Sequence, residues 1–282
     1  MPAANLSEML RKAKSGGYAV GAFNFNGYAD LKGIIEAANE CGAPVVCMAS
    51  SGTVKSMGAR GIACAFGGMA LDSRVPCALH YDHGKDVETI RLCVEAGFTS
   101  VMIDASTKPF DENVEATRRV IEIAKRRDVS VEAELGTVAG REDDVVNGEA
   151  ELIEPSAVLE FIERTGIDAL AIGIGTVHGI YKQKPNIRFD LIERIAALTP
   201  TPLVMHGGTG LSEHDFKNAI ERGICKVNVG TEIKNAFSRR LCELAESGGR
   251  NLDPRVFMDE VGAAAKSIVM GKLEIFGCVG KA

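Results

Sequence analysis

Short apolar runs rich in β-branched residues recur eight times along the chain, and longer amphipathic stretches separate them. The runs cover residues 18–23, 44–49, 76–80, 99–103, 130–134, 169–174, 202–206 and 226–229. Near-continuous apolar character is typical of strands buried on both faces, as in parallel sheets. Helical spacing of apolar residues appears at 29–41, 87–96, 112–127, 156–165, 189–198 and 212–222. This alternation predicts a (β/α)8 TIM barrel.

One barrel accounts for the whole chain of 282 residues, of which 46% are hydrophobic. Barrels of about 250 residues commonly form one domain, so we expect a single domain over residues 1–282. An open doubly wound sheet is the alternative, but it needs a glycine-rich fingerprint after the first strand, and residues 23–27 lack one. We expect an extra N-terminal helix at 5–15 under the barrel and a helical extension at 253–282.

Composition excludes several other classes of protein. The net charge of −6 argues against nucleic-acid binding. We expect no membrane partner, because no apolar run approaches the ~20 residues that cross a bilayer. The eight cysteines form no C-x-x-C pair, and the N-terminus has no apolar signal region. These features predict reduced thiols in a cytoplasmic protein.

Polar residues gather where the predicted strands end, which in a barrel is the face that carries catalysis. They are Asn24, Ser50, His80, Asp82, His83, Asp104, Glu132, Glu134, His178, His206 and Asn228. The charged, glycine-containing segment 136–147 is predicted to be a mobile loop beside this face.

Three of the five histidines, His83, His178 and His206, are the candidate metal ligands of this set. Three imidazoles with one open position form a common catalytic zinc site. Asp82, beside His83, is placed to transfer a proton, or alternatively to orient a histidine from behind. Asp104 and Glu134 could hold a second metal ion or form a salt bridge with a lysine.

Glycine-rich segments follow the last two predicted strands, at 206–210 and 228–231. Glycines let backbone N–H groups approach an anion, and these loops often bind phosphate in barrels. A metal, an acidic partner and a phosphate cradle indicate metal-assisted carbonyl chemistry on a phosphorylated metabolite. Hydrolysis by a metal-bound water stays open. A Schiff-base lysine is the metal-free route, and Lys226 is the one lysine that stands near a strand end in an apolar setting.

At these residues the sequence resembles the class II, metal-dependent ketose-bisphosphate aldolases. The matching stretches are HYDHG (80–84), AGFTSVMIDAS (96–106), PFDENVEATRRV (109–120), VSVEAELGTVAGREDD (129–144), IGTVHGIYK (174–182), LVMHGGTGLS (203–212) and KVNVGTEIK (226–234). The resemblance implies reversible cleavage of a ketose 1,6-bisphosphate to dihydroxyacetone phosphate and an aldehyde.

The resemblance also assigns roles to residues. It implies that His83, His178 and His206 hold zinc, and that Asp104 and Glu134 belong to a second divalent position. Asp82 matches the residue that moves a proton at the C4 oxygen, and Glu142 matches the acid that exchanges a proton at C3. The implied substrate contacts are Asn24, Ser50, Gly179, Lys182, Gly207, Gly208, Thr209, Asn228, Val229, Gly230, Thr231 and Arg255. A monovalent cation, Na⁺ or K⁺, often lies nearby in the family.

The motifs leave open which sugar is cleaved and how many subunits assemble. Gly230 stands where many fructose-type members have Asp or Asn and tagatose-type members have Ala, and Tyr81 stands where Leu is common. We favour fructose 1,6-bisphosphate, with glyceraldehyde 3-phosphate as the aldehyde, over tagatose 1,6-bisphosphate or another phosphorylated ketose. Arg255 would grip the second phosphate in its own or a neighbouring subunit of a homodimer or homotetramer. A metal-dependent hydrolase and a non-catalytic sugar-phosphate-binding subunit are the remaining alternatives.

Overall fold

A closed barrel of parallel strands forms the centre of the computed structural model, which describes residues 3–142, 145–147, 152–179, 186–247 and 253–282. Its strands follow one another around the barrel in the order β1-β11-β10-β8-β5-β4-β3-β2. They are β1 (Val20–Asn24), β2 (Val45–Ala49), β3 (Cys77–Gly84), β4 (Ser100–Ile103), β5 (Ser130–Leu135), β8 (Ala169–Ile172), β10 (Leu203–Met205) and β11 (Ile224–Val229). The predicted (β/α)8 barrel is therefore confirmed.

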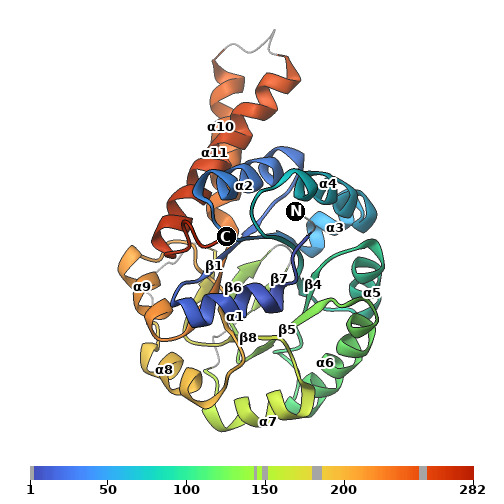
Figure 1. Cartoon of the computed structure of the whole chain (residues 1–282), viewed down its shortest axis with the longest axis vertical. Helices are drawn as coiled ribbons and strands as arrows, with labels where there is room; N and C mark the ends of the chain where they lie inside the picture. Colours follow the sequence, from blue (N-terminus) through green and yellow to red (C-terminus); the bar gives the residue numbers. More distant parts are fainter. Residues whose placement is uncertain (1–2, 143–144, 148–151, 180–185, 248–252) are drawn as a thin grey trace.

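Each predicted helix is present around the barrel (Figure 1). These helices are α2 (Tyr28–Cys41), α5 (Val87–Ala96), α6 (Phe110–Ala124), α7 (Pro155–Thr165), α8 (Phe189–Leu198) and α9 (Glu213–Glu221). A short 3-10 turn, η1 (Lys125–Arg127), completes the predicted 112–127 segment. Local sequence sets their ends: the Ser212 hydroxyl caps α9, and Gly42, Gly97 and Gly166 adopt the left-handed conformation that ends a helix.

The two terminal helices pack on the barrel as expected. Helix α1 (Leu6–Gly16) lies across one end of the barrel in Figure 1, and Ser7 N donates to Ser130 Oγ at the start of β5. Helix α11 (Pro254–Ile275) contributes Val269 and Leu273 to the main apolar core. The other half of α11 pairs with α10 (Thr231–Glu246) in a helical hairpin that projects from the barrel (Figure 1).

The segment predicted as a loop at 136–147 instead contains two strands, so that part of the prediction is wrong. β6 (Ala139–Glu142) pairs with β7 (Val145–Asn147) and with β9 (Val177–His178) in a separate three-stranded sheet. The loop composition of the segment hid the strands because the partner β9 lies far along the chain. Its predicted position beside the site is correct, since Gly140 is opposite His178 in this sheet.

Helices α3 (Ser51–Met57) and α4 (Ala59–Asp72) fill the interval between β2 and β3, for which no helix was predicted. Among the described residues, no helix combines the length and apolarity that crossing a membrane requires.

Candidate functional site

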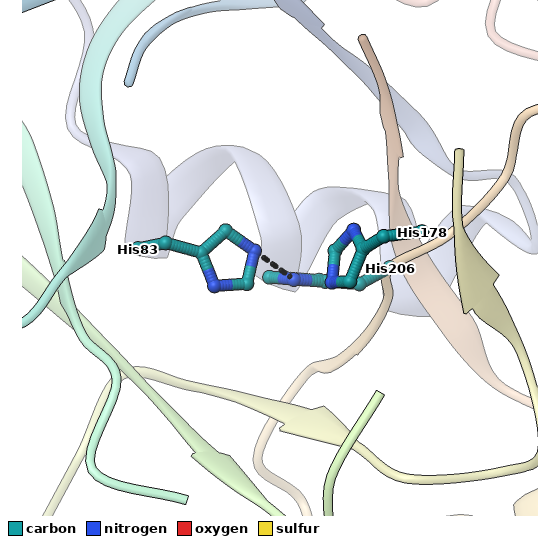
Figure 2. A group of neighbouring side chains, drawn as sticks. All are labelled: His83, His178 and His206. Carbon is teal, nitrogen blue, oxygen red and sulfur yellow. Dashed lines mark hydrogen bonds between the residues drawn. The ribbon is translucent and has the colours of Figure 1, made fainter. Parts of the chain in front are cut away.

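Three imidazole rings, those of His83, His178 and His206, meet at the carboxyl-terminal end of the barrel (Figure 2). Their ring centroids lie 4.6 Å apart for His83 and His206, 5.0 Å for His83 and His178, and 6.0 Å for His178 and His206. One nitrogen from each ring lies within 4.8 Å of the others. The structure thus brings together the three histidines that the sequence singled out.

The first ring is placed by an irregularity in β3. His83 has a φ of 49°, in the left-handed region that non-glycine residues seldom adopt. The pairing register of β3 with β4 shifts between Tyr81 and Gly84, which marks a bulge. Bulges re-aim side chains near active sites, and such backbone strain persists only where surrounding structure enforces it. The bulge turns His83 toward the barrel mouth.

A close backbone contact places the other two rings beside each other. Gly207, which follows His206, has a φ of 71°, and a Cβ there would lie 2.7 Å from the Val177 carbonyl oxygen. Only glycine lets the loop after β10 approach β9 this closely. His206 and His178 are the chain neighbours of the two residues in contact, so the contact sets their separation.

Hydrogen bonds to carboxylates determine which nitrogen of His83 and which nitrogen of His206 faces the cluster. His83 Nδ1 lies 3.1 Å from Asp104 Oδ2, which leaves Nε2 directed at His206. His206 Nε2 lies 3.0 Å from Glu132 Oε1, which leaves Nδ1 directed at His83. Carboxylates in this position fix the tautomer and orientation of metal-binding histidines. The partner that orients His83 is Asp104.

A buried ion pair holds Glu132, the carboxylate that contacts His206. Lys226 Nζ donates to Glu132 Oε2 at 2.8 Å, and both side chains are 0% exposed. Burial opposes the charge of Glu132, but Lys226 and the His206 hydrogen bond override it and hold the pKa of Glu132 well below its ordinary value. The sequence suggested a salt bridge between a lysine and Asp104 or Glu134, but the carboxylate that pairs with a lysine is Glu132. Lys226, considered above as a Schiff-base lysine, is the ion-pair partner of Glu132 in the barrel core.

Asp104 is likewise kept ionised. Burial works against its charge, but hydrogen bonding and charge at His83, with a hydrogen bond from Ser106, lower the pKa of Asp104 well below its ordinary range. Asp104, Glu134 and His83 also form a second group whose ligand atoms lie within 4.8 Å of one another. Three imidazoles with adjoining carboxylates are a donor set suited to a divalent ion such as zinc.

Asp82 is buried between two amide donors. Asn24 Nδ2 donates to its Oδ2 at 2.9 Å, and Asn228 Nδ2 donates to its Oδ1 at 3.2 Å. The Oδ1 of Asn228 is itself buried without a hydrogen-bond partner among the described residues. An amide oxygen left this way beside a metal-type donor set fits a site that receives a ligand.

A polar pocket opens next to the rings and is lined by most of the predicted substrate contacts. Its lining consists of Asn24, Asn26, Ser50, His178, Gly179, Gly207, Gly208, Thr209, Asn228, Gly230, Thr231 and Lys234. Asn26 and Lys234 were not predicted. Lys234 could have been found, because it follows Thr231 at helical spacing at the start of α10.

Four other residues were predicted to belong to the site: Val229, Glu142, Lys182 and Arg255. Val229 is a buried residue of β11. Glu142 belongs to β6, but its side chain, like all of Lys182, lies outside the described residues. Arg255 is the second residue of α11, and its side chain is 88% exposed and pairs with Asp253. It does not line the described pocket of its own chain.

Comparison with known proteins gives one family for nearly the whole chain. Residues 4–281 match the family described as fructose-bisphosphate aldolase class-II.

The chain belongs to the class II fructose-bisphosphate aldolase family.

Named relatives cover its full length. The fructose-bisphosphate aldolase of Staphylococcus epidermidis is 43% identical over 100% of both chains. The probable fructose-bisphosphate aldolase of Bacillus subtilis is 42% identical over 98% of both. Among solved structures, the YdjI aldolase from Escherichia coli K12 is 32% identical, with a TM-score of 0.88 over 99% of each chain. The family identifies the chain as an aldolase, a lyase of carbon–carbon bonds.

Proposed function

We propose that this aldolase is zinc-dependent and cleaves fructose 1,6-bisphosphate reversibly to dihydroxyacetone phosphate and glyceraldehyde 3-phosphate. The observation that carries the proposal is the cluster of three imidazoles opening onto a glycine-lined pocket. The names of the relatives at 42% and 43% identity favour fructose over tagatose.

Zinc would be held by His83, His178 and His206, and a second divalent ion would be held by Asp104 and Glu134. When bound, the catalytic ion would polarise the ketose carbonyl. Glu132 and Asp104 keep the two rings that they contact in the tautomers described above. A monovalent cation, Na⁺ or K⁺, would bind near the phosphate.

One phosphate of the substrate would bind where the loops after β10 and β11 line the pocket. Gly207, Gly208 and Gly230 leave room for an anion to approach the backbone, and Thr209 and Thr231 offer hydroxyl donors. Helix α10 begins at Thr231, so its N-terminal dipole favours negative charge there. Lys234 adds a cationic side chain to the same lining.

Asp82 would accept the proton of the C4 hydroxyl as the C3–C4 bond breaks. The two amide donors hold its carboxylate in a fixed orientation, and a fixed base needs no reorganisation during transfer. The electron pair of the broken bond passes to the three-carbon fragment, and Glu142 would return a proton to C3. The aldehyde leaves with its carbonyl at the former C4.

The reaction is tested by coupled detection of dihydroxyacetone phosphate before and after exhaustive chelation, with zinc then restored. We expect activity to disappear and return. Activity that survives chelation would refute the metal dependence, and release of inorganic phosphate instead of the triose would indicate a hydrolase. A panel of ketose bisphosphates and monophosphates compared by kcat/KM identifies the sugar, and a preference for tagatose 1,6-bisphosphate would overturn the choice of fructose.

We also propose that the chain forms a homodimer or homotetramer in the cytoplasm, with Arg255 contacting the second phosphate in a neighbouring subunit. Its exposed position on the projecting hairpin supports this, because it lies outside the pocket of its own chain. Light scattering measures the assembly. If Arg255→Ala leaves the KM for the bisphosphate unchanged in the oligomer, the assigned contact is wrong.

A further inference from the structure

We infer that the ion pair of Lys272 and Glu232 controls how tightly the two glycine loops bind phosphate, with Lys272 cancelling a negative charge at the edge of the anion site. The inference rests on the proposed function, since it concerns the same phosphate position. It assigns a positioning role to two residues that do not line the pocket.

The pair joins three separate elements at one oxygen atom. Gly210 N, in the loop after β10, donates to Glu232 Oε1 at 3.2 Å. Lys272 Nζ, in the last turn of α11, donates to the same oxygen at 2.9 Å. Glu232 lies in the first turn of α10, immediately after Thr231. The loop that carries Gly207–Thr209 is thereby tied to the helix start that follows Gly230.

Lys272 is held in place by aromatic packing, unlike an ordinary surface lysine. Its residue is 9% exposed, and its Nζ lies 4.8 Å from the ring centroid of Phe216. Phe216 is fully buried, contacts Phe276 edge to face at 5.1 Å, and lies 3.3 Å from where a Cβ on Gly208 would be. The lysine therefore packs on the ring that supports the phosphate loop, and its charge has a fixed position.

The sign of each charge gives the pair its predicted effect. A carboxylate at the N-terminus of α10 occupies the region of positive helix dipole that an incoming phosphate would use. Glu232 alone would repel that phosphate. With Lys272 beside it, the carboxylate still accepts the Gly210 N–H while its charge is balanced, so the loops stay joined without repulsion.

Direct binding measurements on the full-length chain separate this charge effect from a purely structural brace. We would titrate inorganic phosphate and dihydroxyacetone phosphate by calorimetry at low and at high ionic strength. Lys272→Met should weaken binding roughly fivefold at low salt, as expected for one unbalanced charge within several ångströms of an anion, and less at high salt. Glu232→Gln keeps an oxygen acceptor for Gly210 N and should bind as tightly as the wild type or more tightly.

The double variant, Lys272→Met with Glu232→Gln, should return close to wild-type affinity because neither charge remains. Lys266→Met is the matched control: it removes another α11 lysine, which pairs with Glu40 away from the loops, and should leave phosphate binding unchanged. In turnover assays, Lys272→Met should raise KM far more than it lowers kcat. Thermal unfolding checks that each variant is folded.

The possible outcomes test the charge-balancing role separately from the phosphate site itself. If both single variants weaken binding to a similar extent, or if Lys272→Met has no effect, the charge-balancing role is refuted while the phosphate site stands. If the wild-type chain binds neither inorganic phosphate nor dihydroxyacetone phosphate, the phosphate site is refuted and the inference falls with it.

Discussion

Replacing Lys226 by methionine tests the buried ion pair behind His206. The change keeps a long side chain in the barrel core and removes its charge, so Glu132 loses the partner that lies 2.8 Å away. Methionine fills irregular apolar space well, so the loss of packing is small. What remains is a carboxylate without a cation in a place that water does not reach.

The expected cost follows from the geometry. At an effective dielectric constant of about 20, two unit charges 2.8 Å apart attract by roughly 6 kcal/mol. The attraction is opposed by the desolvation of both ions, since both side chains are 0% exposed. Removing one partner leaves the desolvation of the other uncompensated, and such changes cost about 3–5 kcal/mol. We expect the melting temperature to fall by roughly 10 °C.

Urea unfolding in excess chelator measures this loss without any contribution from metal binding. Lys14→Met is the control: Lys14 Nζ donates to the Thr199 carbonyl and forms no ion pair with any described residue, so its loss should cost about 1 kcal/mol. Lys226→Met combined with Glu132→Gln removes both charges, keeps an acceptor for His206 Nε2, and should recover at least half of the lost stability. A single variant that loses less than about 1 kcal/mol, or a double variant no better than the single, would refute this account of the barrel core.

Three further perturbations test other features of the site and the core. Asp104→Ala removes the partner of His83 Nδ1 and should lower zinc affinity by about 10- to 100-fold in competition with a chelator; unchanged affinity would contradict its orienting role. Gly207→Ala should cost stability and zinc affinity, because φ is 71° and the Cβ would meet the Val177 carbonyl at 2.7 Å, whereas Gly61→Ala on the open side of α4 should be neutral or stabilising by up to about 1 kcal/mol. Burial raises the pKa of Cys93 from 9.0 to about 12, so the folded thiol keeps its proton after the unfolded thiol has lost it. Stability should therefore fall as pH rises from about 9 toward 12, by about 1.4 kcal/mol per pH unit for this group, and Cys93→Ala should make the decline shallower; equal slopes would contradict the assignment.

The sequence predicts the barrel well because its strands are buried on both faces. Every residue of β2 and β8 is buried, and that burial appears in the sequence as unbroken apolar runs. Helix α4 escaped prediction because its three glycines lower helix propensity and its buried residues, Ile62, Phe66 and Ala70, number only three. β9 escaped because it is two residues long and is stabilised by pairing with β6.

The site could be predicted only in part, for a related reason. Its histidines could be found because each lies at or beyond the carboxyl end of a barrel strand, and these ends meet at one face. Their hydrogen-bond partners could not, since the neighbour of a side chain that points into a barrel is set by packing across it. Glu132 and Lys226 are 94 residues apart, and no local pattern joins them. The strained backbone conformation of His83 could not be predicted from the sequence either, because a bulge arises from pairing between strands.

The position of the ring cluster has a consequence for how the barrel opens. β4, β5 and β8 separate β3, which carries His83, from β10, which leads to His206. The two residues are 123 positions apart in the chain, so an ion held between them closes a long loop and cross-links opposite walls of the mouth. Opening of the mouth would then require release of the ion. The backbone amides of β3 and β10 should exchange their hydrogens with solvent together, at a rate set by how long the ion stays bound.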